Sequence, residues 1–313
     1  MIAGGVLYAV ASLLYPALSI IWLTLLLRFL QGIGFSSVGT SANAVAAKVT
    51  PPSRIGEGMS YIGAMAALGT AIGPTLGVYI WRRNGSPAIF YTLAAVATVI
   101  VIVCLVNNFE KNRNGNLLQK TTENVNEKAI HRVSKLQLSA SAVTMLIAIP
   151  QSFILTYIIL YGDTKGCSIA DYFFLISAVA MMLARIFFGK SYDRYGAQKT
   201  LIPSISMGIV AIILLCVLPN TFGFLAGAIL YGVSYGVATP VLTAESVRLA
   251  PEDGKGNAVA VYYIGYDLGI GLGALLWGVM IDGLGYNAVF LVAVLFLAVA
   301  IYGSVVIGRL GTQ

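Results

Sequence analysis

Long runs of apolar residues, separated by short polar clusters, fill most of this 313-residue chain. A membrane-spanning helix needs about 20 residues, and these runs have that length. They also lack the period-two alternation of barrel strands. The pattern predicts an all-α polytopic membrane protein, a helical bundle with ten spans at residues 2–16, 19–47, 57–81, 86–107, 138–162, 169–190, 198–218, 221–249, 256–281 and 286–308.

One connection differs from the others. Residues 108–137 are rich in Asn, Lys and Glu. A long polar connection of this kind is typical of a linker between two halves. We therefore expect an N-terminal half-bundle of four spans at 1–107, a cytoplasmic linker at 108–137, and a six-helix C-terminal bundle at 138–313.

Composition and charge exclude a soluble protein. Hydrophobic residues make up 58% of the chain and charged residues 10%, whereas soluble domains carry about 25% charged residues. With Met1 placed in the cytoplasm, the inside segments hold fourteen Lys and Arg and the outside segments three. Cytoplasmic loops collect basic residues. The net charge of +7 thus indicates topology rather than nucleic-acid binding, with both ends cytoplasmic in a plasma or inner membrane.

Groups for catalysis are scarce. The one histidine, His131, lies in the polar linker, and three scattered cysteines form no ligand pattern. No Ser/His/Asp set and no phosphate-binding loop occurs. We expect no enzyme, no metal and no cofactor, and no direct use of ATP.

The chain also repeats internally. Shifted by 200 residues, it matches at seven pairs: Gly32 and Gly232, Pro51 and Pro251, Gly56 and Gly256, Gly69 and Gly269, Gly73 and Gly273, Gly85 and Gly285, Phe90 and Phe290. Parallel repeats of this kind are a transporter architecture. Because the second half has six spans and the first has four, we expect two further helices before Met1. A fragment, a late start codon and a real shortening all remain open, and the chain as given is expected not to transport.

Three local patterns resemble motifs of the major facilitator superfamily, and within it those of the proton-coupled drug and metabolite exporters. The first runs from Gly189 to Lys199 and resembles the cytoplasmic loop motif of the second half, although Ala197 and Gln198 stand where basic residues are usual. The resemblance implies that Asp193 meets a helix N-terminus and latches the cytoplasmic side. Its residues are Gly189, Asp193, Arg194, Gly196 and Lys199.

The other two patterns lie inside spans. Gly69, Gly73, Pro74 and Gly77 resemble the motif that marks antiporters, in which a smooth glycine face and a proline kink form a pivot. Arg28, at the start of an Arg-x-x-Gln-Gly pattern, resembles an arginine implicated in proton movement. Snorkelling of Arg28 to the outer surface is the alternative.

The resemblance also implies a central cavity for a small-molecule substrate. We expect it to be lined by polar and aromatic residues that suit an amphiphilic or weakly cationic ligand: Asn43, Gln151, Tyr157, Tyr231 and Tyr235. Interfacial tyrosine is the alternative for Tyr157 and Tyr235, and is our assignment for Tyr161.

Asp267 lies near the middle of the ninth span, where a carboxylate costs about 2.5–3.5 kcal/mol on insertion scales. Its counterpart in the repeat is Ala67, so the helix does not need an acid to form. We assign proton coupling to Asp267 and Arg28, with an Asp267 tied to backbone groups as the alternative. For Glu245, pairing with Arg248 on the helix surface and pairing with Arg194 both remain open.

The resemblance therefore implies proton-coupled efflux, by antiport and alternating access, of a small amphiphilic compound. The expected partners are that substrate, protons and the lipid bilayer, with no nucleic acid, and the protein is expected to be monomeric. An importer or exporter of a sugar, metallophore or other polar metabolite, and a non-transporting fragment, are the alternatives.

Overall fold

The computed structural model describes residues 1–18, 20–49, 55–106, 135–188, 191–249 and 255–310. These residues are helical almost throughout, as predicted, and contain no strand. The elements are α1 (Ile2–Leu14), η1 (Tyr15–Ala17), α2 (Ile21–Val49), α3 (Ile55–Asn84), α4 (Ser86–Val106), α6 (Lys135–Thr164), η3 (Ser168–Tyr172), α7 (Phe173–Phe188), α8 (Ser191–Val217), α9 (Thr221–Arg248) and α10 (Lys255–Leu310).

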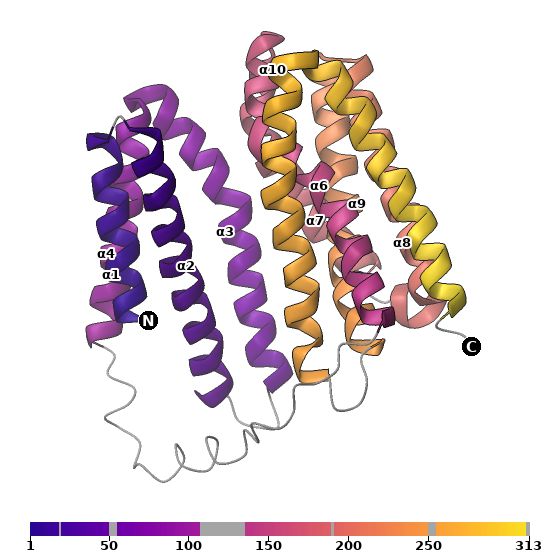
Figure 1. Cartoon of the computed structure of the whole chain (residues 1–313), viewed down its shortest axis with the longest axis horizontal. Coiled ribbons are helices and arrows are strands. Elements are labelled where there is room, and N and C mark those ends of the chain that lie inside the picture. The colour runs from indigo at the N-terminus through magenta and orange to yellow at the C-terminus, as the bar shows by residue number, and fades with distance from the viewer. Residues whose placement is uncertain (19, 50–54, 107–134, 189–190, 250–254, 311–313) are drawn as a thin grey trace. The chain divides into compact units, whose positions relative to one another are not determined.

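Helix α10 contains two spans. The backbone of Gly285 has φ 76° and ψ 175°, so the helix breaks there and the chain reverses direction, as the orange and yellow arms of α10 show (Figure 1). The predicted spans 256–281 and 286–308 fall on these two arms. Seven helices of the described residues are long and apolar enough to cross a membrane. Large apolar side chains such as Trp22 and Val279, each 76% exposed, suit contact with lipid.

The chain divides into two compact units, Met1–Asn126 and Glu127–Gln313. The predicted linker 108–137 lies outside the described residues except for 135–137, where α6 begins. In the first unit, α1 packs against α2 and α4. Gly4 and Gly34 make the first of these contacts close, because a Cβ on Gly34 would lie 2.7 Å from the Gly4 carbonyl oxygen.

In the second unit, α6 packs against α10, while α9 packs against α7 and α8. Its core is aromatic at the centre: Phe153 meets Phe290 edge to face at 5.0 Å, and the buried Trp277 donates its indole N–H to the Ile149 carbonyl at 2.8 Å. Such aromatic contacts add to the burial of apolar surface. This core fixes the positions of α6, α9 and α10, which carry most of the candidate site residues.

Corresponding elements of the two units have matching bounds. A shift of 200 residues places α2 on α9 and α3 on the first arm of α10, and it places Gly85, with φ 81°, on Gly285. A positive φ is costly for residues other than glycine. The two glycines therefore mark the same reversal between helices in each unit.

The packing of the two units differs. A Cβ on Gly269 of α10 would lie 2.7 Å from the Met145 carbonyl oxygen and 2.6 Å from the Ala148 Cβ, both on α6. A Cβ on Gly69 of α3 would meet nothing within 4 Å. Likewise, 61% of the apolar stretch of α9 is buried, against 17% of the stretch Ile21–Gly39 in α2. The faces of α2 and α3 that correspond to covered faces of α9 and α10 are therefore open in the described structure.

Candidate functional site

A buried carboxylate on α9 is held by an arginine of the same helix and by a tyrosine of α8. Arg248 donates from Nε and Nη2 to the two carboxylate oxygens of Glu245, at 2.9 and 2.6 Å, and the Tyr192 hydroxyl donates to Glu245 Oε2 at 3.1 Å. Glu245 is 5% exposed. A buried carboxylate needs such partners, and a bidentate arginine is a strong one. We call Tyr192, Glu245 and Arg248 the clasp.

The clasp modifies both expectations for Glu245. Its partner is Arg248, but the pair is buried on the Glu245 side instead of lying on the helix surface. Arg194, the other expected partner, has its guanidinium over the ring of Tyr195, 5.3 Å from the ring centre. Tyr192 could not be predicted as the third member, because it lies 53 residues from Glu245 in the chain.

The loop motif surrounds the clasp. Gly196 adopts φ 81° and ψ 173°, which breaks α8 and supplies the positive φ expected of it. Lys199 and Arg194 are exposed. Gln198, one of the two departures from the motif, donates from Nε2 to the Val305 carbonyl of α10 at 2.8 Å. Gly189 and the side chain of Asp193 lie outside the described residues.

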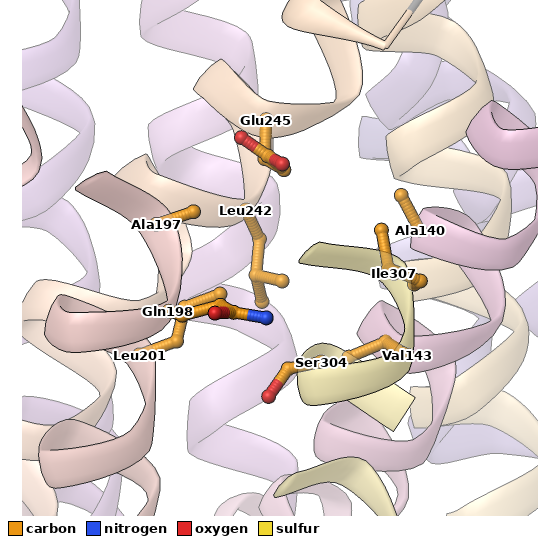
Figure 2. Close-up of a pocket in the computed structure, with 9 residues that line it drawn as sticks. All are labelled: Ala140, Val143, Ala197, Gln198, Leu201, Leu242, Glu245, Ser304 and Ile307. Atoms are coloured by element: carbon orange, nitrogen blue, oxygen red, sulfur yellow. The ribbon is translucent and has the colours of Figure 1, made fainter. Parts of the chain in front are cut away.

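A small cavity lies beside the clasp. Figure 2 shows Glu245 at one end of it and Gln198 pointing into it. Its volume is about 20 Å³, which is enough for one water molecule. Alanine and aliphatic side chains with one hydroxyl complete the lining: Ala140, Val143, Ala197, Leu201, Leu242, Ser304 and Ile307. The space is too small for an organic substrate.

Three of the five predicted substrate residues, Gln151, Tyr231 and Tyr235, meet in the second unit. The rings of Tyr231 and Tyr235 lie 4.6 Å apart, and the Tyr235 hydroxyl donates to the Ile147 carbonyl at 3.2 Å. Gln151 of α6 interacts with Tyr231 and with Tyr266 of α10. We call these four residues the tyrosine cluster. Tyr266 was missed in the sequence, although it directly precedes Asp267.

The remaining tyrosines have structural contacts. Tyr157 donates its hydroxyl to the Ala274 carbonyl at 3.0 Å and touches the position of Gly278. Tyr161 is fully buried and donates to the Leu215 carbonyl at 3.1 Å, so its assignment to the membrane interface is wrong. It is part of the aromatic core. The side chain of Asn43 lies outside the described residues.

Asp267 lies in the first arm of α10 and is exposed. It forms no ion pair with the described charged side chains of the helices packed on α10, namely Asp163, Arg194, Lys199, Glu245 and Arg248. The titratable group that it influences is Tyr266. The structure thus places an unpaired carboxylate on the surface of the second unit, within the stretch Val259–Ile307 that can span a membrane.

Arg28 belongs to a polar network in the first unit. Its guanidinium lies over the ring of Tyr15, 4.9 Å from the centre, and donates to Gln31 Oε1 at 3.3 Å. Gln31 in turn donates to the Ser12 hydroxyl of α1 at 2.9 Å. Tyr15 stacks on Phe90 of α4 with ring centres 4.4 Å apart. The cation therefore has partners on α2 and η1.

The antiporter-like motif lies on α3. Pro74 sits inside the helix, and Gly69, Gly73 and Gly77 would each accept a Cβ without contact. The described residues contain no group of three or more His, Cys, Asp or Glu that could hold a metal ion. The described structure therefore contains three candidate features: the carboxylate of Asp267, the tyrosine cluster with Gln151, and the clasp between α8 and α9.

Comparisons with known proteins agree with this architecture. The chain is 25% identical over 297 residues to the MFS-type transporter YhhS of Escherichia coli K12, which covers 95% of this chain and 71% of that protein. It is 25% identical over 295 residues to a multidrug resistance efflux pump PmrA homologue of Lactococcus lactis, covering 91% and 71%. It is also 24% identical over 279 residues to the staphylopine export protein of Staphylococcus aureus, covering 85% and 68%.

Solved structures share the fold. A variant of the nucleoside transporter NupG has a TM-score of 0.75 at 13% identity, covering 98% of this chain and 82% of that one. An inward-facing bacterial homologue of the lysosomal transporter Spinster has a TM-score of 0.69 at 14% identity, covering 98% and 82%. The family model of the Major Facilitator Superfamily matches residues 1–222 and 174–310. The chain is therefore a multi-pass membrane protein that belongs to the Major Facilitator Superfamily of transporters.

Proposed function

We propose that the protein is a secondary transporter of the cell membrane that exports a small amphiphilic compound in exchange for protons, by alternating access. The observation that carries this proposal is Asp267, an unpaired carboxylate within a membrane-spanning stretch. A charged carboxylate there is costly, and binding a proton or a cation removes the cost. The repeat counterpart Ala67 supports a role beyond helix formation.

Arg28 is proposed as the second coupling residue. Its position over Tyr15 and its link through Gln31 to Ser12 tie it to α1, α2 and η1. A charge that appears or disappears near Arg28 would therefore affect contacts with three elements of the first unit. Two relatives, an efflux pump homologue and an export protein, support export as the direction.

The clasp and the loop motif are proposed to hold the cytoplasmic end of the second unit closed. The clasp joins α8 to α9 through a buried carboxylate, and Arg194, Gly196 and Lys199 of the motif follow Tyr192 in the chain. Gly189 and Asp193 are proposed to belong to the same latch. Opening the end would require the Tyr192 contact to Glu245 to break. The glycines of the antiporter-like motif, with Pro74, are proposed as the seal and pivot of α3.

The open faces of α2 and α3 support one further part of the proposal. Their counterparts in the second unit are covered by α6 and α7: Gly269 packs on α6, and Gly232 packs on Ser177 and Ala180 of α7, whereas Gly69 and Gly32 meet nothing. We propose that the first unit is an incomplete half-bundle. The chain by itself then binds substrate and protons without carrying them across the membrane.

The test measures proton release on binding. The purified chain in weakly buffered detergent solution, at a pH where Asp267 is partly protonated, receives ethidium or the neutral dye Nile red, while a pH indicator follows the solution. We expect each dye that binds to release protons from the wild type, because in an exchanger the bound substrate and the bound proton disfavour each other. The Asp267→Asn variant should release none, and Asp282→Asn on the same helix is the control. Binding to the wild type without proton release would refute the proposed exchange.

A further inference from the structure

A basic and aromatic patch surrounds the turn between α3 and α4, at the end of the first unit opposite the N-terminus (Figure 1). Tyr79, Trp81 and Tyr91 are exposed there, and so are Arg82 and Arg83. The Arg82 guanidinium lies over the Trp81 ring, 5.8 Å from its centre. We call these five residues the turn patch. Tryptophan and tyrosine gather at the level of lipid headgroups, so the composition of the patch suits the membrane surface.

Arg83 is held in place but its charge is not neutralised. Its Nη1 donates to the Tyr79 hydroxyl at 2.8 Å, and it forms no ion pair with a described residue. Among residues 1–106 the one acidic residue is Glu57. At 1.5 Å per residue, Glu57 lies about 39 Å from Arg83 along α3, well beyond a screening length of roughly 8–10 Å. The described helices of the first unit therefore supply no counter-charge for Arg83.

The repeat indicates that the turn does not need this chemistry in order to form. Both units reverse direction here at a glycine with positive φ. In the second unit the equivalents of Tyr79, Trp81, Arg82 and Tyr91 are Val279, Ile281, Asp282 and Leu291. The same backbone turn thus forms with aliphatic side chains and with the opposite charge. Basic residues are also scarce on the side predicted to be external, which favours a binding role for the pair of arginines.

An apolar face of α3 leads away from the turn patch. Ile72, Leu76, Tyr79 and Arg83 follow one another at spacings of four, three and four residues, so they lie on one face of the helix. Ile72 and Leu76 are exposed. The face extends about 16 Å from Arg83 to Ile72 at 1.5 Å per residue, which is about half of a 30 Å hydrocarbon core. A ligand that fits the whole face has an anionic head and a long apolar chain.

We propose that the turn patch and the adjoining face of α3 bind an anionic phospholipid. The forked N–H groups of Arg83 and Arg82 match the oxygens of a phosphate, and the acyl chain lies along Leu76 and Ile72. A zwitterionic lipid brings its own positive charge to the arginines and is attracted less. A soluble phosphate ester shares the head chemistry but leaves the apolar face uncovered. This inference does not depend on the proposed exchange of substrate and protons.

Two tryptophans at the same end of the first unit allow a local test. Trp22, at the start of α2, is exposed, and the third tryptophan, Trp277, is fully buried, so lipid does not reach it. The chain is placed in phosphatidylcholine bilayers that contain phosphatidylglycerol or phosphatidylcholine brominated near the glycerol, and quenching gives the affinity of one lipid relative to the other. Trp22→Phe leaves Trp81 as the reporter, and Trp81→Phe leaves Trp22. We expect Trp81 to favour phosphatidylglycerol about tenfold or more, at about fivefold per arginine, and Trp22 to show little preference.

Variants in the Trp22→Phe chain assign the preference. Arg83→Gln should lower it about fivefold, and Arg82→Gln combined with Arg83→Gln should abolish it. Arg83→Lys should keep most of it, because the charge remains. Lys165→Gln is the matched control: Lys165 is also exposed and stacked on a tyrosine, but in the second unit, and its loss should change nothing. Thermal unfolding of each variant checks the fold.

Three results would overturn the lipid site. The first is equal affinity of the two lipids at Trp81, or a preference that survives in the double arginine variant. The second is a preference of the same size at Trp22 that falls in Lys165→Gln, which would indicate attraction to the overall charge of the protein. The third is relief of quenching by soluble glycerophosphoglycerol, which would assign the arginines to free phosphate esters.

Discussion

The repeat provides a matched pair of glycines, Gly269 and Gly69, whose replacement by alanine should have opposite effects. In the second unit, the new methyl group would lie 2.7 Å from the Met145 carbonyl oxygen and 2.6 Å from the Ala148 Cβ. Both neighbours are on α6. Neither can rotate away, because one is a backbone oxygen and the other is a Cβ bonded directly to the backbone. Overpacking of this kind costs about 1–3 kcal/mol. Alanine returns up to about 1 kcal/mol through its helix propensity.

Gly69→Ala has only the stabilising effect of higher helix propensity. Its methyl group would meet nothing within 4 Å, so we expect no loss and a gain of up to about 1 kcal/mol. The two variants should therefore differ by roughly 1–3 kcal/mol, although they make the same chemical change at equivalent positions. For a unit of this size, each kcal/mol corresponds to roughly 2–4 °C in unfolding temperature.

A thiol-reactive dye can measure unfolding unit by unit. Cys167 is buried in the second unit, and Cys104 is partly buried in the first. Chains that keep only Cys104 or only Cys167, with Cys216 also replaced, would report on one unit each. Gly269→Ala should lower the temperature at which Cys167 reacts, whereas Gly69→Ala should leave Cys104 unchanged or more protected. A loss in Gly69→Ala as large as that in Gly269→Ala would mean that another helix covers α3, and the open-face argument would fail.

Three further predictions concern the clasp, the arginine network and transport. Tyr192→Phe removes one hydrogen bond to a buried carboxylate and should destabilise the second unit by about 1–3 kcal/mol in the same Cys167 assay. Tyr195→Phe, at an exposed position on the same helix, is the control and should cost less. Equal effects of the two variants would remove Tyr192 from the clasp. Arg28→Met should destabilise the first unit by about 1 kcal/mol, through loss of the contact to Tyr15, and Arg28→Lys by less; no change in the Cys104 assay would show that the contact is not made. Proteoliposomes of the 313-residue chain should show no proton-driven flux, and robust flux would contradict an incomplete first unit.

Much of the fold could be predicted from the sequence, because the length of an apolar run and the position of a turn glycine are visible within a short segment of the chain. The apolar runs predicted the helices. Gly85 and Gly285, which the repeat pairs, each lie at a reversal with positive φ. The openness of the α3 glycines could not be predicted. Gly69 and Gly269 look identical in sequence, and only the presence or absence of a neighbouring helix distinguishes them.

The site was partly predictable for a similar reason. A mid-span aspartate and clustered tyrosines stand out against an apolar background, so Asp267, Gln151, Tyr231 and Tyr235 could be selected as candidates from the sequence. Contacts between distant segments have no local signal: Tyr192 reaches Glu245 across 53 residues and Gln198 reaches Val305 across 107. Tyr161 was misplaced because a tyrosine near a helix end suits the membrane interface as well as a core.

The exchange of a proton for the substrate at Asp267 is tested most directly by infrared difference spectroscopy of the chain in lipid at acidic pH. Adding ethidium, a cationic probe, should remove one protonated-carboxyl band and create carboxylate bands in the wild type, because the cation replaces the proton. Asp267→Asn should show neither change, while Asp282→Asn should behave as the wild type. A carboxyl signal that persists in Asp267→Asn, or a wild-type spectrum in which ethidium binds and no carboxyl deprotonates, would contradict the account.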